Sequence, residues 1–252
     1  MKSRNTRAFA DHFSSHAGLY AKHRPRYPLA LFHWLATVAP GTALAWDAGT
    51  GNGQVATGLV TRFARVHATD ASAAQIANAE AHPRITYATA DYASGLEAGS
   101  AQLVTVGQAL HWFDVDAFVR EARRVLQPGG VLAVFTYEYS AVSPEVDALT
   151  RHHADVTLGH YWPPERQLVN DRYRSIALPI DELVPPPLEL HEDWTLEQFT
   201  GYLRSWSATQ RCLAARGEEP IVAFERALAA AWGDVGRRAV RWPLTIRAGE
   251  IR

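Results

Sequence analysis

The stretch AWDAGTGNGQVA, residues 45–56, constrains the fold of this chain more than any other. Its apolar start is typical of a buried strand, and the acid Asp47 ends that run. Glycines follow at alternate positions before apolar residues resume with helical spacing. Glycines in such a turn let the backbone approach a ligand closely. The stretch therefore predicts a strand, a tight ligand-binding turn and a helix, with Gly49, Gly51 and Gly53 in the turn.

Apolar runs and helical patterns alternate through the first 140 residues. Pro28 begins the first helical pattern, Ser72 is placed to cap a later helix, and Asp114 another. Strands separated by helices predict βαβ units and a parallel sheet. Right-handed crossovers make such a sheet open and doubly wound, with ligands at the carboxyl ends of its strands. The predicted strands are residues 42–46, 65–70, 85–91, 101–109 and 131–139.

The alternation stops after residue 139. Residues 144–235 are helical in tendency and rich in Trp and Pro, although 188–194 and 239–247 have the pattern of strands. We expect these two strands to return to the sheet edge and the helices to cap the ligand site. The predicted organisation is a lid segment at 1–27, an α/β core at 28–140, a helical cap with a sheet-edge strand at 141–235, and a final core strand at 236–252.

The acids near the glycine turn indicate which ligand it holds. Asp70 ends the next strand 21 positions after Gly49, close to the spacing at which an acid meets ribose hydroxyls. Asp47 would repel a pyrophosphate but would suit an ammonium group. In a dinucleotide-binding turn the third glycine would stand at position 54, where this chain has Gln. The turn is also not followed by the lysine that binds the phosphates of a nucleoside triphosphate. The turn therefore favours an adenosine ligand that is cationic and free of phosphate, namely S-adenosylmethionine.

Composition and charge limit the classes of molecule that this chain is expected to bind. Its 252 residues have a formal net charge of −1 and a pI of about 6.8, which do not suggest a nucleic-acid partner. The single cysteine, Cys212, excludes a disulfide framework and a Cys-based zinc site, and the histidines at 152, 153 and 160 lack metal-site spacing. No signal peptide or membrane span is evident, so we expect a cytoplasmic protein. Monomer and homodimer both remain open.

Four stretches carry a resemblance to a known family: YAKHRPRYP at 20–28, DAGTGNGQ at 47–54, QALHWFD at 108–114 and EARRVLQPGG at 121–130. In these the chain resembles class I S-adenosylmethionine-dependent methyltransferases, and within them the small-molecule branch that includes trans-aconitate methyltransferases. The resemblance implies an open, mostly parallel seven-stranded Rossmann-like sheet with a helical cap. It also implies transfer of a methyl group from S-adenosylmethionine to a small-molecule acceptor.

The resemblance assigns roles to individual positions. The glycines would surround the methionyl and ribose parts of the cofactor, Asp47 would stand near its ammonium group, and Asp70 would bind the ribose. Asp91 and Tyr92 would lie beside the adenine, and the N-terminal segment, including Tyr27, would close over the cofactor. The implied cofactor-binding residues are Tyr20, Arg24, Asp47, Gly49, Gly51, Gly53, Asp70, Ala71, Asp91, Tyr92 and Gln108.

The role of His111, as a general base or as a wall of the pocket, depends on the chemical nature of the methyl acceptor. If the acceptor is a hydroxyl, a base is useful, and His111 follows the fourth predicted strand directly. If the acceptor is a carboxylate, no base is needed, His111 only walls the pocket, and an arginine such as Arg204 should anchor the substrate. Trp112 and Trp206 are the expected apolar lining. Oxygen is the expected acceptor atom, ahead of nitrogen and carbon.

Two other functions are compatible with this pattern. A non-catalytic protein that binds S-adenosylmethionine would keep the fold without turnover, because a fold alone does not fix an activity. A nicotinamide-dependent oxidoreductase would need room for a pyrophosphate beside Asp47. Cofactor-binding measurements distinguish the oxidoreductase from the non-catalytic protein. Methyl transfer to an acceptor would distinguish a methyltransferase from both of these alternatives.

Overall fold

The protein is built around one twisted sheet. The computed structural model describes residues 24–252, so Tyr20 and most of the expected lid segment lie outside the described residues. Seven strands follow the order β3-β2-β1-β4-β5-β8-β6, and an eighth, β7, pairs with β8 alone. The first five are parallel, while β8 runs antiparallel to its neighbours, which confirms the predicted open, mostly parallel sheet. The strands are β1 (Leu44–Ala48), β2 (Arg65–Asp70), β3 (Ile85–Thr89), β4 (Ala101–Gly107), β5 (Leu126–Tyr137), β6 (Ile180–Glu182), β7 (Glu189–Trp194) and β8 (Arg238–Ile251).

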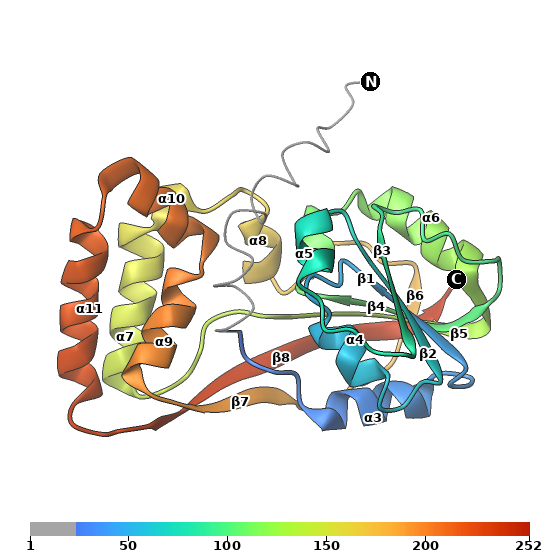
Figure 1. Cartoon of the computed structure of the whole chain (residues 1–252), viewed down its shortest axis with the longest axis horizontal. Coiled ribbons are helices and arrows are strands. Elements are labelled where there is room, and N and C mark those ends of the chain that lie inside the picture. Colours follow the sequence, from blue (N-terminus) through green and yellow to red (C-terminus); the bar gives the residue numbers. More distant parts are fainter. Residues whose placement is uncertain (1–23) are drawn as a thin grey trace.

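Helices cover both faces of the sheet (Figure 1). On one face, α3 (Leu29–Val38) and α4 (Gln54–Leu59) pack on β1 and β4, and on the other α6 (Val115–Val125) packs on the same strands. The expected N-caps are present. Ser72 Oγ accepts a hydrogen bond of 3.3 Å from Gln75 N at the start of α5 (Ala73–Ala77), and Asp114 Oδ1 accepts one of 3.0 Å from Ala117 N.

A second lobe of helices stands beside the sheet, at the left of Figure 1. Its core is aromatic, with Trp194, Tyr202, Trp206, Trp232 and Trp242 buried together. A short helix, α8 (Arg166–Asn170), lies between this lobe and the sheet. The lobe consists of α7 (Pro144–His152), the π-helix His153–Thr157, the 3-10 turn Gly159–Tyr161, α9 (Leu196–Arg204), α10 (Ser207–Arg216) and α11 (Glu219–Trp232).

The two late strands differ from the sequence expectation. The strand at the sheet edge is β6, which no sequence pattern revealed, rather than residues 188–194. The reason is the length of β8, which has 14 residues. Residues 244–250 of β8 pair with β5, and its first residues extend out to the helical lobe, where β7 pairs with them. Therefore residues 236–252 form more than a final core strand, because they also join the two lobes.

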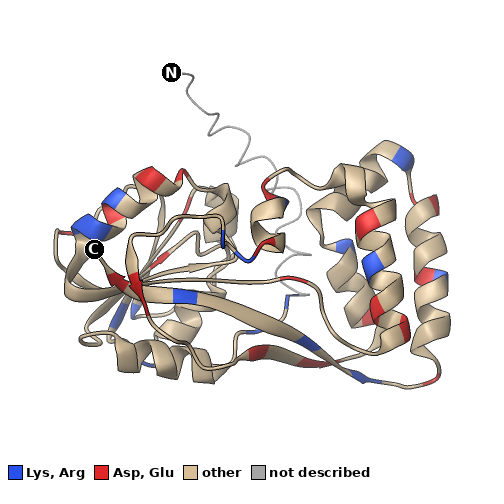
Figure 2. Ribbon diagram, turned by 180° about the vertical axis from the view of Figure 1, so that it is seen from behind, with Lys and Arg blue, Asp and Glu red and all other residues tan. Residues whose placement is uncertain are grey.

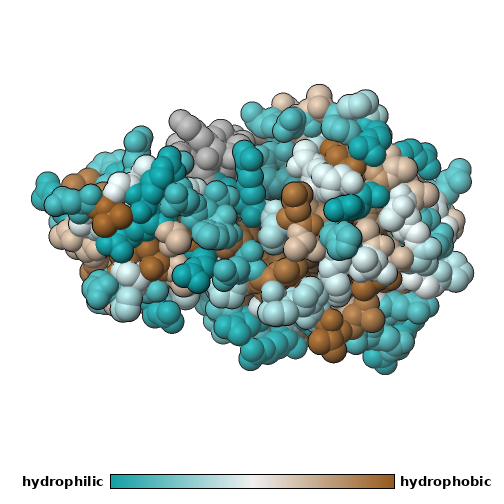
Figure 3. All heavy atoms as spheres, turned by 90° about the horizontal axis from the view of Figure 1, so that it is seen from below, coloured by the Kyte–Doolittle hydropathy of each residue, from teal (hydrophilic) through white to brown (hydrophobic). Residues whose placement is uncertain are grey.

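The surface carries charges of both signs in both lobes (Figure 2). Brown, apolar residues on the face seen from below form small groups among teal ones (Figure 3). Exposed apolar side chains of this kind are ordinary on the surfaces of folded proteins. Within residues 24–252, no helix is both long enough and apolar enough to span a bilayer.

Candidate functional site

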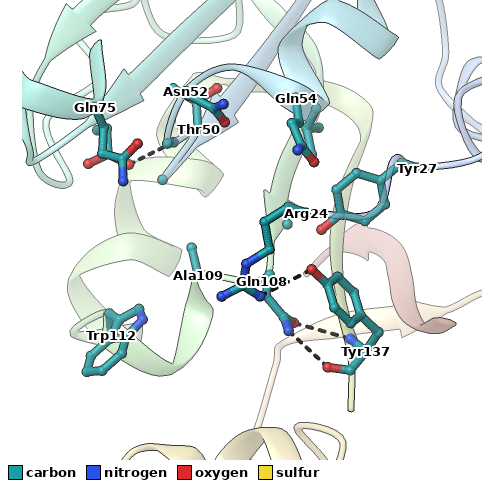
Figure 4. Close-up of a pocket in the computed structure, with 15 residues that line it drawn as sticks. Arg24, Tyr27, Thr50, Asn52, Gln54, Gln75, Gln108, Ala109, Trp112 and Tyr137 are labelled. Carbon is teal, nitrogen blue, oxygen red and sulfur yellow. Dashed lines mark hydrogen bonds between the residues drawn. The ribbon is translucent and has the colours of Figure 1, made fainter. Parts of the chain in front are cut away.

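A pocket opens where β1, β2, β4 and β5 end, as expected for a doubly wound sheet (Figure 4). The turn after β1 forms one side, and Trp112 and Tyr137 form another. Tyr137 also belongs to the apolar core of the helical lobe, so the pocket borders both lobes. The lining residues are Arg24, Tyr27, Gly49, Thr50, Gly51, Asn52, Gln54, Val55, Asp70, Gln75, Gly107, Gln108, Ala109, Trp112 and Tyr137.

The structure shows why glycine stands at two positions of the turn after β1. Gly49 has a φ of 68°, and a Cβ there would lie 2.7 Å from Ala109 Cβ, so no larger residue fits. Gly51 has a φ of 57°, but a Cβ there would meet nothing within 4 Å. The open side of Gly51 lines the pocket, which leaves backbone exposed to a ligand.

Asp70 is held in place by the backbone around it. Its Oδ2 accepts a hydrogen bond of 2.8 Å from Gly51 N, and its Oδ1 accepts one of 2.8 Å from Ser72 N. Burial raises the pKa of Asp70, and these two hydrogen bonds oppose that rise. The carboxylate is therefore fixed at the pocket wall with lone pairs left for hydroxyl donors.

Gln75 joins Asp70 at this end of the pocket and was missed by the sequence reasoning. It is 3% exposed, and its Oε1 has no hydrogen-bond partner. A buried amide oxygen without a donor costs free energy, so a ligand that donates a hydrogen bond would be stabilised there. The only signal in the sequence was its place three residues after the N-cap Ser72.

Asp47 lies beneath the turn and is fully buried, rather than lining the pocket itself. Its Oδ1 accepts a hydrogen bond of 2.7 Å from Thr105 Oγ1, while Oδ2 has no partner. Burial is the largest cause that raises its pKa to about 7, and the charge of Asp70 adds to the rise. A cation close to this carboxyl group would lower the pKa again. The unpartnered acceptor thus fits the ammonium group of S-adenosylmethionine.

Gln108 is held in a strained conformation at the end of β4, with a φ of 55°. Its Nε2 donates a hydrogen bond of 2.9 Å to Tyr137 O, and its Oε1 accepts one of 3.2 Å from Tyr137 N and a short one from Thr136 Oγ1. The amide therefore ties β4 to β5. Arg24 Nη1 lies 3.4 Å from Tyr137 Oη, and Figure 4 shows Arg24, Tyr27, Gln108 and Tyr137 gathered at this end of the pocket.

His111 lies in the 3-10 turn Leu110–Trp112 and adjoins the pocket through Trp112, whose ring centroid is 4.8 Å from its own. Its Nδ1 is 2.9 Å from the hydroxyl of Tyr173. Burial lowers the pKa of His111 to about 3, and the charges of Arg166 and Arg24 contribute to this. The imidazole is thus neutral over the physiological range.

Arg166, on α8, supplies a positive charge that no sequence motif revealed. Its guanidinium carbon lies 4.7 Å from the ring centroid of Trp162 and 5.7 Å from that of Tyr139. Its Nε donates a hydrogen bond of 3.0 Å to Asn170 Oδ1. Among the residues that the structure describes, no carboxylate lies within salt-bridge distance of Arg166. Such a half-buried guanidinium favours an anionic ligand.

Two residues expected beside the adenine are absent from the pocket lining, and so is Ala71. The exposed Asp91 accepts hydrogen bonds at its own turn, of 2.6 Å from Tyr92 N and 3.3 Å from Ala93 N. The ring of Tyr92 packs on Phe113, with 5.7 Å between ring centroids. These contacts do not support the expectation that Asp91 and Tyr92 lie beside the adenine.

The two cap residues expected to contact substrate also lie outside the pocket lining. Arg204 Nη2 donates a hydrogen bond of 2.9 Å to Glu225, and its Nη1 donates one of 3.0 Å to Glu218. Trp206 is 5% exposed and packs in the core of the lobe, with its ring centroid 5.5 Å from that of Trp162. The structure thus does not bring Arg204 or Trp206 to the site. Among the described residues, no group of three or more His, Cys, Asp and Glu side chains is placed to hold a metal.

Comparison with known proteins adds to this geometry. The family profile described as "Methyltransferase domain" matches residues 46–134. A Dictyostelium discoideum protein named as a methyltransferase is 30% identical over 229 residues, which cover 89% of this chain and 87% of that protein. A solved structure of an Anaeromyxobacter dehalogenans protein, named as a type II methyltransferase, is 46% identical, with a TM-score of 0.85, and the match covers 90% of this chain and 97% of that chain. The [4+2]-cyclase SpnF shares the fold at 16% identity, with a TM-score of 0.53 over 100% of this chain and 98% of its own.

Proposed function

Because this chain belongs to the class I S-adenosylmethionine-dependent methyltransferases, we propose that it methylates an oxygen atom of a small anionic molecule. The observation that carries this proposal is the positive charge of two arginines: Arg24 lines the pocket, and Arg166 is on α8, which contacts the 3-10 turn of His111. Arg166 has no carboxylate partner among residues 24–252, and the charges of both arginines contribute to the low pKa of His111. A site with this potential attracts a carboxylate, whose oxygen is also the methyl acceptor.

The cofactor would occupy the pocket from Asp70 toward Gln108. Asp70 and Gln75 would accept hydrogen bonds from its adenosine part, the backbone at Gly51 would pass close to it, and Asp47 would lie near its ammonium group. S-adenosylmethionine supplies an activated methyl group on its sulfonium. The main work of the protein is then to orient the acceptor and to exclude water, and orientation can contribute on the order of 7–11 kcal/mol.

The low pKa of His111 favours the carboxylate acceptor over the hydroxyl. An effective general base has a pKa near the working pH, whereas burial and two arginines lower that of His111 to about 3. A carboxylate is already deprotonated and needs no base. His111 then serves as a wall and hydrogen-bonding group, and Arg166 takes the anchoring role that the sequence suggested for Arg204.

The proposal is tested first by calorimetric titration of the purified protein with S-adenosylhomocysteine, NADH and NADPH. Micromolar binding of S-adenosylhomocysteine alone is expected, and binding of a reduced nicotinamide instead would contradict the proposal. An acceptor screen with labelled S-adenosylmethionine then compares small carboxylic acids with phenols and amines. Turnover confined to phenols or amines would contradict the anionic acceptor, and binding without any turnover would favour the non-catalytic alternative.

A further inference from the structure

The pocket wall at the end of β4 has a backbone conformation that its residue type does not favour. Gln108 directly follows β4 and lines the pocket, and its φ of 55° lies in the left-handed region. Glycine adopts this region freely, whereas a Cβ makes it unfavourable. Strain of this kind persists where the surrounding structure enforces it, and it is frequent at functional sites. The hydrogen bonds of Gln108 show what enforces it.

The side chain of Gln108 takes a place in the sheet that its own backbone carbonyl would normally have. In a regular parallel pair, a residue that donates its N–H to one residue accepts from the N–H two positions further along that strand. Gln108 N donates a hydrogen bond of 2.9 Å to Phe135 O, so Tyr137 N should donate next to Gln108 O. Tyr137 N donates instead to Gln108 Oε1, at 3.2 Å, and no residue within 24–252 donates to Gln108 O. The left-handed turn therefore takes the carbonyl out of the ladder, and the side chain replaces it there.

Two further hydrogen bonds hold the amide of Gln108 in that place (Figure 4). Its Nε2 donates one of 2.9 Å to Tyr137 O, and its Oε1 also accepts one from Thr136 Oγ1. Thr136 is fully buried and Tyr137 is 4% exposed, and hydrogen bonds are stronger away from water. Because Oε1 accepts two hydrogen bonds from β5, no lone pair is left on it for a ligand. The side chain of Gln108 thus serves the sheet.

The turn held by this amide decides how two loops of the pocket meet. Ala109 follows Gln108 and packs against the turn after β1, since a Cβ on Gly49 would lie only 2.7 Å from Ala109 Cβ. Both residues line the pocket, and their strands, β1 and β4, are neighbours in the sheet. A change in the backbone at Gln108 would therefore move Ala109, and with it this wall of the pocket.

We propose that Gln108 is a positioning residue for the cofactor. Its amide replaces its own carbonyl in the ladder with β5, and thereby holds the left-handed turn that places Ala109 against Gly49. The inference rests on the proposed place of the cofactor in this pocket, and it does not depend on which acceptor is methylated. Without the amide the turn would adopt other conformations as well. A ligand that needs one conformation then binds more weakly, in proportion to the time spent in the others.

Two variants of the full chain separate the amide from the backbone conformation. Gln108→Asn keeps an amide, and Asn tolerates the left-handed region, but its side chain is one methylene too short to reach β5. Gln108→Gly removes the strain and the amide together. The matched control is Gln102→Asn, at the other end of β4 and outside the pocket lining. Gln102 is 8% exposed, and its Oε1 accepts a hydrogen bond of 2.7 Å from Leu44 N, so it also joins two strands.

Calorimetry with S-adenosylhomocysteine measures binding, and hydrogen exchange of the Tyr137 amide, followed by NMR, reports on the Gln108 side chain without any ligand. Gln108→Asn and Gln108→Gly should both bind about tenfold more weakly, as expected if the turn is competent about a tenth of the time. Exchange at Tyr137 should become about tenfold faster in both. Gln102→Asn should leave binding and this exchange unchanged, while its free energy of unfolding in urea falls as in the Gln108 variants.

Wild-type affinity in Gln108→Gly would overturn the proposal, because the amide would then be unnecessary. An equal loss of affinity in Gln102→Asn would overturn it too, because the effect would then come from general stability. If the Gln108 variants do not fold, Thr136→Val removes one donor to Oε1 and should change both measurements by about threefold; no change in either would overturn the proposal. If the wild type fails to bind S-adenosylhomocysteine, the proposed place of the cofactor is wrong. Slow exchange at Tyr137 that is lost in Gln108→Asn would still show that the amide holds the turn, so the two failures are distinguishable.

Discussion

The two ends of the candidate site are built in different ways. At the cofactor end, Asp70 and the glycine turn come from consecutive strand ends, and backbone N–H groups hold the carboxylate. At the proposed acceptor end, which adjoins the pocket through Trp112, His111 and Tyr173 come from separate segments, and the hydroxyl of Tyr173 lies 2.9 Å from His111 Nδ1. The cofactor end can therefore be recognised from local sequence, whereas the proposed acceptor end depends on packing between distant segments.

The largest expected effect is at the cofactor end. Asp70→Ala removes an acceptor for ribose hydroxyls and leaves two backbone N–H groups without their partner. Hydrogen bonds to charged groups contribute about 1.5–3 kcal/mol each, so S-adenosylhomocysteine should bind on the order of a hundredfold more weakly. Calorimetry measures this. Asp91→Ala is the matched control, and a comparable loss in that variant would restore the adenine contact that the geometry does not support.

At the acceptor end, Arg166→Gln should raise the KM of an anionic acceptor by about thirtyfold, because it removes a bidentate anchor worth about 2 kcal/mol. The Kd of S-adenosylhomocysteine should stay the same, since Arg166 does not line the cofactor pocket. Steady-state kinetics and calorimetry separate the two effects. Arg151→Gln removes the other arginine over Tyr139, an exposed one, and serves as the control. Equal effects of the two variants would contradict a specific anchor.

The pKa of Asp47 makes cofactor binding depend on pH. Burial raises that pKa to about 7, and a cofactor ammonium group favours the ionised form. Binding below pH 7 must therefore release a proton, and the affinity for S-adenosylhomocysteine should fall by up to about tenfold per pH unit from pH 7 to 6. Calorimetry in two buffers of different ionisation enthalpy counts the proton. The dependence should vanish in Asp47→Asn, and its persistence there would assign it to another group.

The smallest expected effect is on stability at the acceptor end. Because the folded-state pKa of His111 lies below its unfolded value of about 6.5, its contribution is fully present above pH 6.5 and is lost as the pH falls toward 3. Burial lowers the pKa of His153 to about 4, so this residue also makes the fold less stable as the pH falls. The raised pKa of Asp47 has the opposite effect on stability. Between pH 6.5 and 5, the free energy of unfolding measured with urea should fall by about 1 kcal/mol less in His111→Gln than in the wild type. An identical loss in both proteins would contradict a buried, neutral His111.

The comparison also separates good expectations from poor ones. The N-caps Ser72 and Asp114 form as predicted, because each cap is decided by a hydrogen bond three residues away. Arg204 was expected at the acceptor because a cap arginine is a reasonable anchor, yet two glutamates from α11 and the turn before it bind it. No spacing in the sequence distinguishes Arg204 from Arg166.

Short stretches of sequence were enough to predict the alternation of strands and helices, the glycine turn and the acid that ends β2, because these features depend on neighbours within a few residues. Packing between distant segments set the reach of β8, the edge strand β6 and the contact between Tyr173 and His111. The physical reason is that local hydrogen bonds and periodic burial are written in short windows of sequence. The partner of a long side chain depends instead on which distant elements pack beside it.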